Sequence, residues 1–260
     1  MSQVPAGDPG SSRAALVTGG SRGMGRSTAL ALAARGYDVA INFSRSREAA
    51  ELVAEAVTGE GRQALLLQAD VSDEGAVTEM LAQVSERFGR LDALVNNAGT
   101  SVAGDASDLA GLGLEDWDRI FAVNVRGLFQ VTRAAHPLLR RAHGCVVNMA
   151  SIAGLRPTLQ PLPYAASKAA VVSLTRTLAR ALAPEVRVNA VAPGWVQGEW
   201  MEQALGDDYQ RLMARRGQHT PLGRVAQADD VAEAILALIE SNRFVTGEVV
   251  TVDGGYRATT

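Results

Sequence analysis

Residues 14–25, which read Ala-Ala-Leu-Val-Thr-Gly-Gly-Ser-Arg-Gly-Met-Gly, decide the fold. An apolar, β-rich run leads into a glycine turn, and a segment with helical spacing follows it. A strand, a glycine turn and a helix start together bind anions, because free backbone N–H groups and the helix dipole point at one spot. Glycine also lets the backbone approach a pyrophosphate closely. The alternative is an ordinary glycine turn, and the spacing Gly19-x-x-x-Gly23-x-Gly25 differs from the common G-x-G-x-x-G.

Short apolar runs alternate with longer segments of helical spacing along the chain. Most of the runs lack polar alternation, which is typical of strands buried on both faces of a parallel sheet. The predicted strands are 14–18, 38–42, 63–68, 93–96, 145–149, 187–192 and 248–252, and the predicted helices are 25–35, 46–60, 72–88, 115–139, 164–183 and 228–239. This order predicts an α/β Rossmann fold with a doubly wound, seven-stranded parallel sheet and helices on both faces.

No proline-rich linker or break in composition divides the chain, so we predict a single domain over residues 13–260. The preceding residues 1–12 are rich in Gly, Pro and Ser and predict a flexible tail. A polar segment of helical pattern at about 198–217 predicts a mobile substrate lid. Because the glycine turn stands at the first strand–helix junction of such a domain, we predict a dinucleotide site there. Its residues are Gly19, Ser21, Arg22, Gly23, Met24 and Gly25.

Composition excludes several classes of protein. Of the 260 residues, 26 are Gly, 47% are hydrophobic and only 5% are aromatic, so Ala, Val and Leu must build the core. The net charge of -3 argues against a nucleic-acid binder, and no apolar stretch approaches the roughly 20 residues that span a membrane. The single cysteine, Cys145, and three dispersed histidines predict no metal site. We expect a cytoplasmic protein.

The end of the second predicted strand indicates which dinucleotide binds. An NAD site places an acidic residue there for the ribose 2′-hydroxyl, whereas a 2′-phosphate prefers a nearby arginine. No acid ends this strand; Ser44 and Arg45 follow it, and Arg22 lies in the glycine loop within reach. Both arginines could instead be solvated surface groups. We predict NADP(H) in preference to NAD(H), with Ser44 and Arg45 in the site.

Tyr164 and Lys168 stand four residues apart at the start of a predicted helix, so they share one helix face. A phenol with a pKa near 10 exchanges protons slowly at neutral pH. A neighbouring ammonium would stabilise the phenolate and lower that pKa, which suits a general acid or base. The alternative for an isolated Tyr-x-x-x-Lys is a buried tyrosine and a surface lysine.

Five motifs together resemble the short-chain dehydrogenase/reductase (SDR) family. They are 18–25, Asn96-Asn97-Ala98-Gly99, Ser151, Tyr164-Ala165-Ala166-Ser167-Lys168 and Pro193-Gly194; Val245-Thr246-Gly247 and Val252-Asp253-Gly254-Gly255 are similar as well. The resemblance covers residues 13 to 256 in the expected order. It implies hydride transfer between a nicotinamide and a carbonyl or secondary alcohol. It also implies a catalytic tetrad of Asn124, Ser151, Tyr164 and Lys168.

The resemblance gives each tetrad member a role. Ser151 would hydrogen-bond the substrate carbonyl while Tyr164 protonates it, and Lys168 would also bind the nicotinamide ribose. Asn124 would distort its helix and hold a water that relays protons. By the same resemblance, further cofactor contacts are Asp70, Val71, Asn97, Ala98, Gly99, Pro193, Gly194 and Val196. The family often has threonine five residues after the proline, where this chain has Gly198.

The sequence leaves two classes of substrate open. The chain is most similar to 3-oxoacyl-carrier-protein reductases and related NADPH-dependent ketone reductases. However, the family's carrier-docking arginines match Ala142 and the region 184–185, which is not basic. A small or medium apolar ketone is therefore our main prediction, and a carrier-protein thioester is the alternative. The expected substrate residues are Ser151, Leu155, Tyr164, Trp195, Trp200 and Met201. Arg156 could hold a substrate carboxylate or be solvated.

A non-catalytic dinucleotide sensor on the same fold is a second functional class, but such proteins usually lose catalytic side chains. An epimerase or dehydratase of the extended branch would need a separate substrate domain, for which this chain has no room. By resemblance the protein is a homotetramer that associates through the helices at 115–139 and 164–183 and through the C-terminal strand.

Overall fold

A computed structural model describes residues 12–102, 109, 111–158 and 160–259; the predicted tail therefore lies almost entirely outside the described residues. All seven predicted strands form. They are β1 (Arg13–Val17), β2 (Tyr37–Phe43), β3 (Ala64–Gln68), β4 (Ala93–Asn96), β5 (Cys145–Met149), β6 (Arg187–Pro193) and β7 (Val249–Val252). They pair in the order β3-β2-β1-β4-β5-β6-β7, and every pairing is parallel. The predicted α/β Rossmann fold is confirmed.

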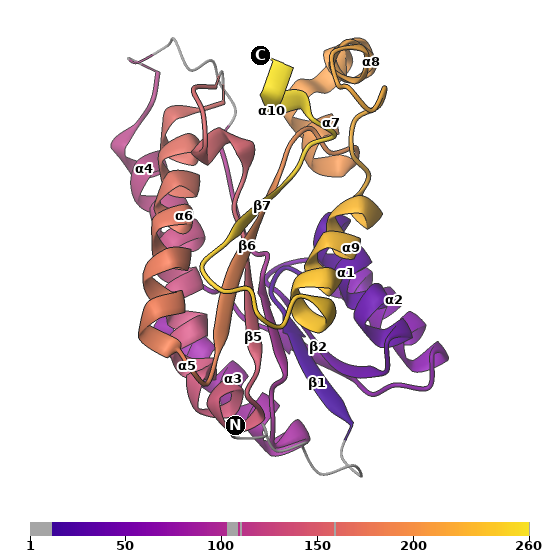
Figure 1. Ribbon diagram of the computed structural model, residues 1–260, viewed down its shortest axis with the longest axis vertical. Coiled ribbons are helices and arrows are strands. Elements are labelled where there is room, and N and C mark those ends of the chain that lie inside the picture. Colours follow the sequence, from indigo (N-terminus) through magenta and orange to yellow (C-terminus); the bar gives the residue numbers. More distant parts are fainter. Residues whose placement is uncertain (1–11, 103–108, 110, 159, 260) are drawn as a thin grey trace.

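Helices cover both faces of this sheet, as predicted (Figure 1). One face carries α1 (Gly23–Ala34), α2 (Arg47–Gly59) and α9 (Ala228–Leu236); the other carries α3 (Glu74–Phe88), α4 (Leu114–Phe121), α5 (Leu128–Ala142) and α6 (Leu162–Leu182). Each face has its own apolar core. Fully buried residues of β1, β2 and α1, such as Val17, Ile41 and Leu32, build one core, and Leu16, Leu94 and Leu139 belong to the other.

Strand order reverses between β1 and β4, which are neighbours in the sheet although they are far apart in the chain. In doubly wound sheets, ligands bind outside the carboxyl ends of the strands at such a switch point. The glycine turn follows β1 directly and therefore lies there. The loops after β4, β5 and β6 reach the same edge of the sheet, because all the strands are parallel.

The expected single helix at 115–139 is interrupted. It forms α4 and α5 with a π-helical turn, Ala122–Gly127, between them, and it runs on to Ala142. A second π-helical turn, Ala237–Ser241, extends α9. The predicted lid segment forms α7 (Glu199–Leu205), a short 3-10 turn (Gly206–Asp208) and α8 (Tyr209–Gln218), and α10 (Tyr256–Thr259) follows β7. Its helical pattern is thus confirmed, while its mobility stays a prediction.

Two helix ends agree with simple capping rules. Asp73 caps α3 by accepting a hydrogen bond from the N–H of Ala76, one residue after the Ser72 start that the sequence suggested. Gly36 follows α1 with a φ of 83°, a left-handed conformation that favours glycine. Among the described residues no helix is long and apolar enough to cross a bilayer, and no group of three possible metal ligands gathers.

Candidate active site

Asn42, near the end of β2, holds the glycine loop in place. Its Oδ1 accepts from the N–H of Gly19 at 3.3 Å, and its backbone carbonyl accepts from the N–H of Gly20 at 2.8 Å. Its Nδ2 donates to the carbonyls of Leu67 and Ala69. Sequence reasoning missed this residue, although an asparagine inside an apolar strand run is itself a signal. Strand β2 therefore fixes where the loop lies relative to β3.

Asn97 holds the loop from the other side. Its Nδ2 donates to the carbonyls of Thr18 and Gly19 at 2.9 and 3.0 Å. In return the hydroxyl of Thr18 accepts from the backbone N–H groups of Asn97 and Ala98, each at 3.0 Å. The sequence places Asn97 in the cofactor site, but both of its amide N–H groups are used within the chain. Its Nδ2 thus holds the glycine loop, and a contact of Asn97 with the cofactor stays a prediction.

The start of α1 is open to an anion. Its N-cap, Arg22, makes no side-chain capping bond, and no acidic residue stands in the first turn. Nothing described lies within 4 Å of a Cβ built on Gly23, whereas a Cβ on Gly25 would lie 2.2 Å from the carbonyl oxygen of Gly19. Gly25 is therefore required by helix–loop packing, and Gly23 leaves space beside the helix start. These features fit a dinucleotide pyrophosphate.

Arg22 lies beside the end of β2, where the sequence predicts a 2′-phosphate site. Its Nη2 donates to the hydroxyl of Ser46 at 2.5 Å, and its Nη1 lies 3.3 Å from the carboxylate of Glu199. Ser44 and Arg45 are both exposed at the same strand end. The structure thus brings the two predicted arginines to one region, where Glu199 of α7 pairs with Arg22 but no residue from 42 to 46 of the chain is acidic.

The predicted adenine contacts after β3 differ in their surroundings. Asp70 is exposed, and its Oδ1 accepts from the N–H and the hydroxyl of Ser72 at 2.8 and 2.7 Å. Val71 is 5% exposed and packs against Gly127, where an added Cβ would lie 2.8 Å from its Cγ2. Its carbonyl accepts from Gln130 at 2.9 Å. The side chain of Val71 therefore packs in the core, and its contact with the cofactor stays a prediction.

The predicted catalytic residues come together at the carboxyl edge of the sheet. Ser151 follows β5, and Tyr164 and Lys168 lie in the first two turns of α6. The Ser151 side chain is hydrogen-bonded to Tyr164, and its hydroxyl also accepts from the N–H of Ala153 at 3.1 Å. The Nζ of Lys168 lies 5.6 Å from the centroid of the Tyr164 ring. The four-residue spacing thus places both groups on one face of the helix, as predicted.

The electrostatics of this pair differ from expectation. Burial raises the pKa of Tyr164 above its ordinary value, and the hydrogen bond with Ser151 opposes that shift only in part. Burial also lowers the pKa of Lys168 to about 8. Its Nζ donates to the carbonyl of Met149 at 2.7 Å, so the ammonium is bound to β5. The expected lowering of the Tyr164 pKa is therefore wrong, because the effect of burial is larger.

Asn124 lies in the π-helical turn between α4 and α5, where the resemblance placed a helix distortion. Its Oδ1 accepts from the N–H of Thr100 at 2.7 Å, and its Nδ2 donates to the carbonyl of Thr100 and the hydroxyl of Ser167. A Cβ on Gly99 would lie 3.4 Å from the Asn124 Oδ1 and 3.8 Å from the Lys168 Nζ. Asn124 and Lys168 therefore flank one small space that Gly99 keeps open.

A buried polar cluster beneath the site was not predicted. Asn96 donates through Nδ2 to Thr132 and to the Oδ1 of Asn148, each at 2.9 Å. Asn148 in turn donates to Thr175 at 3.0 Å. These bonds join β4, β5, α5 and α6 directly below the loops that carry the catalytic residues. Asparagines at matched positions of two apolar strands would have been the signal.

The residues after β6 shape the substrate side of the site. Pro193 ends β6, a Cβ on Gly194 would lie 2.6 Å from the Cβ of Asp253, and Val196 forms a parallel bridge with Ala226. Gly198 has a φ of 137° before α7, a conformation that threonine rarely adopts. The replacement of the usual threonine by Gly198 therefore agrees with the backbone at this position.

Predicted substrate residues divide into two groups. The ring of Trp200, which is half exposed, lies 6.5 Å from the ring of Tyr164 between centroids. Trp195 and Met201 are partly buried. They are close to Trp200 in the sequence: Trp195 precedes α7, and Met201 lies in its first turn. Leu155 instead packs against an apolar cluster that includes Val171. The structure thus supports Trp200 beside the tyrosine most directly.

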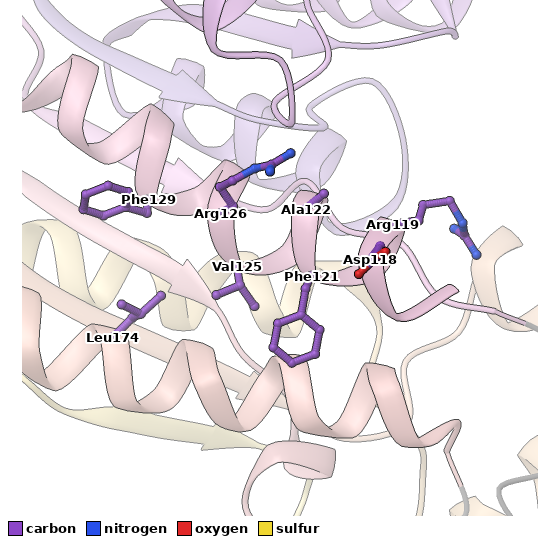
Figure 2. A pocket seen from close by; sticks show the side chains of 8 residues that line it. All are labelled: Asp118, Arg119, Phe121, Ala122, Val125, Arg126, Phe129 and Leu174. Carbon is purple, nitrogen blue, oxygen red and sulfur yellow. The ribbon is translucent and has the colours of Figure 1, made fainter. Parts of the chain in front are cut away.

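A surface hollow lies away from this site, on the outer face of the helices (Figure 2). Phe121 and Val125 point from the α4–α5 segment toward α6, which contributes Leu174 (Figure 2). Phe129 also lines the hollow and is 40% exposed. Apolar side chains thus gather on the face where the sequence predicts subunit contacts.

Comparisons with known proteins agree with this geometry. Residues 19–257 match a family model described as enoyl-(acyl carrier protein) reductase. The chain is 44% identical, over 93% of its length and 94% of the relative, to a granaticin polyketide synthase protein of Streptomyces violaceoruber assigned as ketoacyl reductase 2. It is 38% identical to the 3-oxoacyl-[acyl-carrier-protein] reductase FabG of Staphylococcus aureus, over 94% of this chain and 97% of the relative.

A solved structure described as levodione reductase shares the fold, with a TM-score of 0.88 and 32% identity. The alignment covers 96% of this chain and 99% of that one. Sequence motifs, strand order, the catalytic geometry and these relatives all agree. The chain belongs to the short-chain dehydrogenase/reductase family, whose members are oxidoreductases that act on carbonyl and alcohol groups.

Proposed function

We propose that the chain is an NADP(H)-dependent reductase of ketones, with Tyr164 as the general acid and base. The observation that carries this proposal is the convergence of Ser151, Tyr164 and Lys168 at the carboxyl edge of the sheet. The uncapped start of α1 opens toward the same edge. Cofactor site and proton donor are thus held by rigid elements of one domain.

The bound nicotinamide would supply the hydride, and the chain's own residues would handle the proton and the oxyanion. The Ser151 hydroxyl would donate to the substrate carbonyl oxygen, and Tyr164 Oη would give that oxygen its proton. The positive charge of Lys168, 5.6 Å from the tyrosine ring, would stabilise the phenolate left behind. In this proposal Lys168 must exchange its bond with Met149 for contacts to the cofactor ribose.

Asn124 would support the route by which Tyr164 regains a proton from solvent after it has given its own to the substrate oxygen. Its side chain is fixed by Thr100 and Ser167, and the space beside Gly99 adjoins both Asn124 and Lys168. A water in that space would connect the lysine to solvent. This role comes from the family resemblance, and the π-helical turn at Asn124 supports it.

Preference for NADP(H) rests on charge at the end of β2. Arg22 and Arg45 lie there with Ser44 and Ser46, and the acid that would bind a 2′-hydroxyl is absent from this strand end. Guanidinium groups bind phosphate strongly through paired hydrogen bonds. We expect kcat/KM to be higher with NADPH than with NADH, and Arg45→Ala and Arg22→Ala to weaken NADPH binding. Equal turnover with both cofactors would contradict this.

We infer that the substrate is a small or medium ketone with an apolar surface around the carbonyl. Trp200 beside Tyr164, with Trp195 and Met201 close by in sequence, supports an apolar site. A panel of ketones with NADPH tests the reaction. Tyr164→Phe should abolish turnover while NADPH binding persists. Binding of NADPH with no turnover of any ketone would instead favour the non-catalytic sensor.

A 3-oxoacyl-carrier-protein thioester is the second candidate, and the names of the two relatives favour it. Geometry gives less support. The expected docking region lies where α5 ends and β5 begins, at the amino edge of the sheet, whereas Tyr164 lies at the carboxyl edge. Arg140 there is 3.5 Å from Glu185, so its charge is already partly neutralised. Comparing acetoacetyl-carrier protein with a free ketone separates the two candidates.

A homotetramer is the expected assembly. The apolar side chains that line the outer hollow support contact through α4, α5 and α6 (Figure 2). Phe129 is exposed, and Phe121, Val125 and Leu174 are partly buried. Sedimentation should give a tetramer, and Phe129→Arg should shift it toward smaller species. A wild-type monomer would refute the assembly. The cytoplasmic location also stays a prediction.

A further inference from the structure

Arg216 of α8 lies over an aromatic ring of the loop that follows β6. Its Cζ is 4.5 Å from the centroid of the Trp195 ring, and its Nη1 donates to the hydroxyl of Tyr256 at 2.8 Å. These contacts fix the guanidinium between the loop after β6 and the C-terminal helix α10. The side chain is thus held in one place.

Two buried donors of this pair lack an acceptor. Within the described part of the chain, the Nε of Arg216 and the Nε1 of Trp195 have no hydrogen-bond partner, although both atoms are buried. No described carboxylate lies within 4.0 Å of Arg216. Buried donors, above all cationic ones, are unfavourable without an acceptor. A further acceptor is therefore expected at this position.

Nearby acids are engaged elsewhere. Asp253, whose Cβ lies close to Gly194, accepts from the backbone N–H groups of Gly255 and Arg257 at 2.9 and 2.8 Å. On the lid segment, Glu199 pairs with Arg22 and Asp208 pairs with Arg211. Arg216 thus has no acidic partner among the described residues, and its charge can pair with an anion that binds from outside the chain.

The pair lies next to the catalytic residues. Trp195 follows Gly194, and a Cβ on Gly194 would lie 3.7 Å from Ile152, the residue after Ser151. From the same loop, Arg156 brings its Cζ to 5.7 Å from the Tyr256 ring centroid. Arg156 is five positions after Ser151, so their Cα atoms are at most about 18 Å apart. A medium-sized substrate could reach both residues within this limit.

We propose that Arg216 and Trp195, with Arg156 beside them, form an anion-binding subsite, and that the reduced ketone carries a carboxylate or phosphate at its far end. The inference rests on the proposed reductase function and narrows its substrate class. A carboxylate would belong to a free oxo acid. A phosphodiester would belong to a pantetheine arm, and both present anionic oxygens to N–H donors.

Two series of matched substrates test the subsite, with NADPH and the full chain. The first series compares levulinate and its longer homologues, which are anionic, with their neutral methyl esters. The second compares acetoacetyl-phosphopantetheine, which carries a phosphate, with acetoacetyl-pantetheine, which does not. We expect kcat/KM to be at least about tenfold higher for the anionic member of one series, as the loss of a charge-assisted hydrogen bond implies. The series that shows the preference identifies the anion.

Arg216→Met should remove that preference, so that the anionic and the neutral member of a series react with similar kcat/KM. Arg215→Met is the matched control, because it removes the same charge from the next, exposed residue of α8 and should keep the preference. Ligand-detected NMR of the same compounds gives a readout independent of turnover. Anion binding that depends on Arg216 without any ketone turnover would refute the reductase and keep the subsite.

Three results would overturn the subsite. One is equal kcat/KM and equal binding for anionic and neutral members in both series, which would mean that water satisfies the two donors. Another is an equal effect of Arg216→Met and Arg215→Met, which would indicate bulk charge alone. The third is failure of every anion to bind in either series.

Discussion

The guanidinium of Arg22 in the glycine loop lies 3.3 Å from the carboxylate of Glu199, the first residue of α7. This ion pair connects the expected phosphate site to the predicted lid. Both side chains are more than half exposed, so the pair itself contributes little to stability. The pair matters because Glu199 and the 2′-phosphate of NADPH would compete for the same guanidinium, that of Arg22.

Glu199→Gln should therefore tighten NADPH binding. Removing the carboxylate frees Arg22 and removes a repulsive charge, and the gain is at most about fivefold, because the pair is exposed. NADH binding should not change, since NADH lacks the 2′-phosphate. Fluorescence titration with each cofactor measures both dissociation constants. Glu202→Gln, one turn further along α7, is the control and should alter neither; an equal gain for NADH would refute the competition.

Gly25→Ala should destabilise the chain and weaken cofactor binding. The new Cβ would lie 2.2 Å from the carbonyl oxygen of Gly19 and 2.5 Å from the Asn97 amide, so α1 must move away from the loop. Overpacking of this kind costs about 1–3 kcal/mol. Urea denaturation gives the loss in free energy, and NADPH titration gives the loss in affinity.

Gly59→Ala, at the end of α2, is the matched control for that substitution. No described atom lies within 4 Å of its added Cβ, and its φ is not in the left-handed region. We expect no loss of stability or affinity, because alanine is the better helix former. A similar loss in both variants would mean that the tight contact at Gly25 is not the cause.

Sequence periodicity predicts the sheet and most helices of this chain because parallel strands and amphipathic helices have strong, regular patterns. It could not predict the break at Asn124. A π-helical turn inserts one residue into a helix and so shifts the 3.6-residue pattern by a single position, with no proline to mark the break. Only the family resemblance pointed to a distortion there.

The sequence also does not reveal site residues whose partners are distant in the chain. The role of Asn42 depends on its strand lying between β1 and β3, and that of Arg216 depends on α8 folding back over Trp195. Neither relationship is expressed in sequence spacing. Tyr164 and Lys168 could be paired in advance because helix geometry fixes residues four apart. Their pKa values could not be predicted from the sequence, because burial depends on the whole fold.

Without added cofactor, Tyr164 should lose its proton at a higher pH than an ordinary tyrosine. Burial raises its pKa, and the hydrogen bond with the Ser151 side chain does not reverse the direction. The phenolate absorbance of the chain, minus that of Tyr164→Phe, should show no rise near neutral pH and should rise later than that of a free tyrosine. A Tyr164-dependent phenolate near neutral pH would show that Lys168 already activates the tyrosine in the absence of NADPH.

Lys168 should make the free energy of unfolding rise with pH. Its pKa is about 8 in the folded chain against 10.5 ordinarily, because burial disfavours the ammonium. Between these values the unfolded chain binds more protons than the folded one, so stability rises through this window. The difference corresponds to about 3 kcal/mol. Below pH 8 both states are protonated and the folded chain carries the full cost of burying the charge.

Lys168→Met removes this titrating group, so the free energy of unfolding of the variant should not show this rise with pH. Cys145 and Tyr37, whose pKa values burial raises to about 11 and about 12, lower stability in alkali, but they do so equally in both chains. The difference between the two unfolding curves therefore isolates the lysine. It should grow in favour of the wild type between pH 8 and 10.5, as measured by urea denaturation at closely spaced pH values. Parallel curves would mean that the ammonium in the folded chain is solvated or compensated, which would contradict its burial.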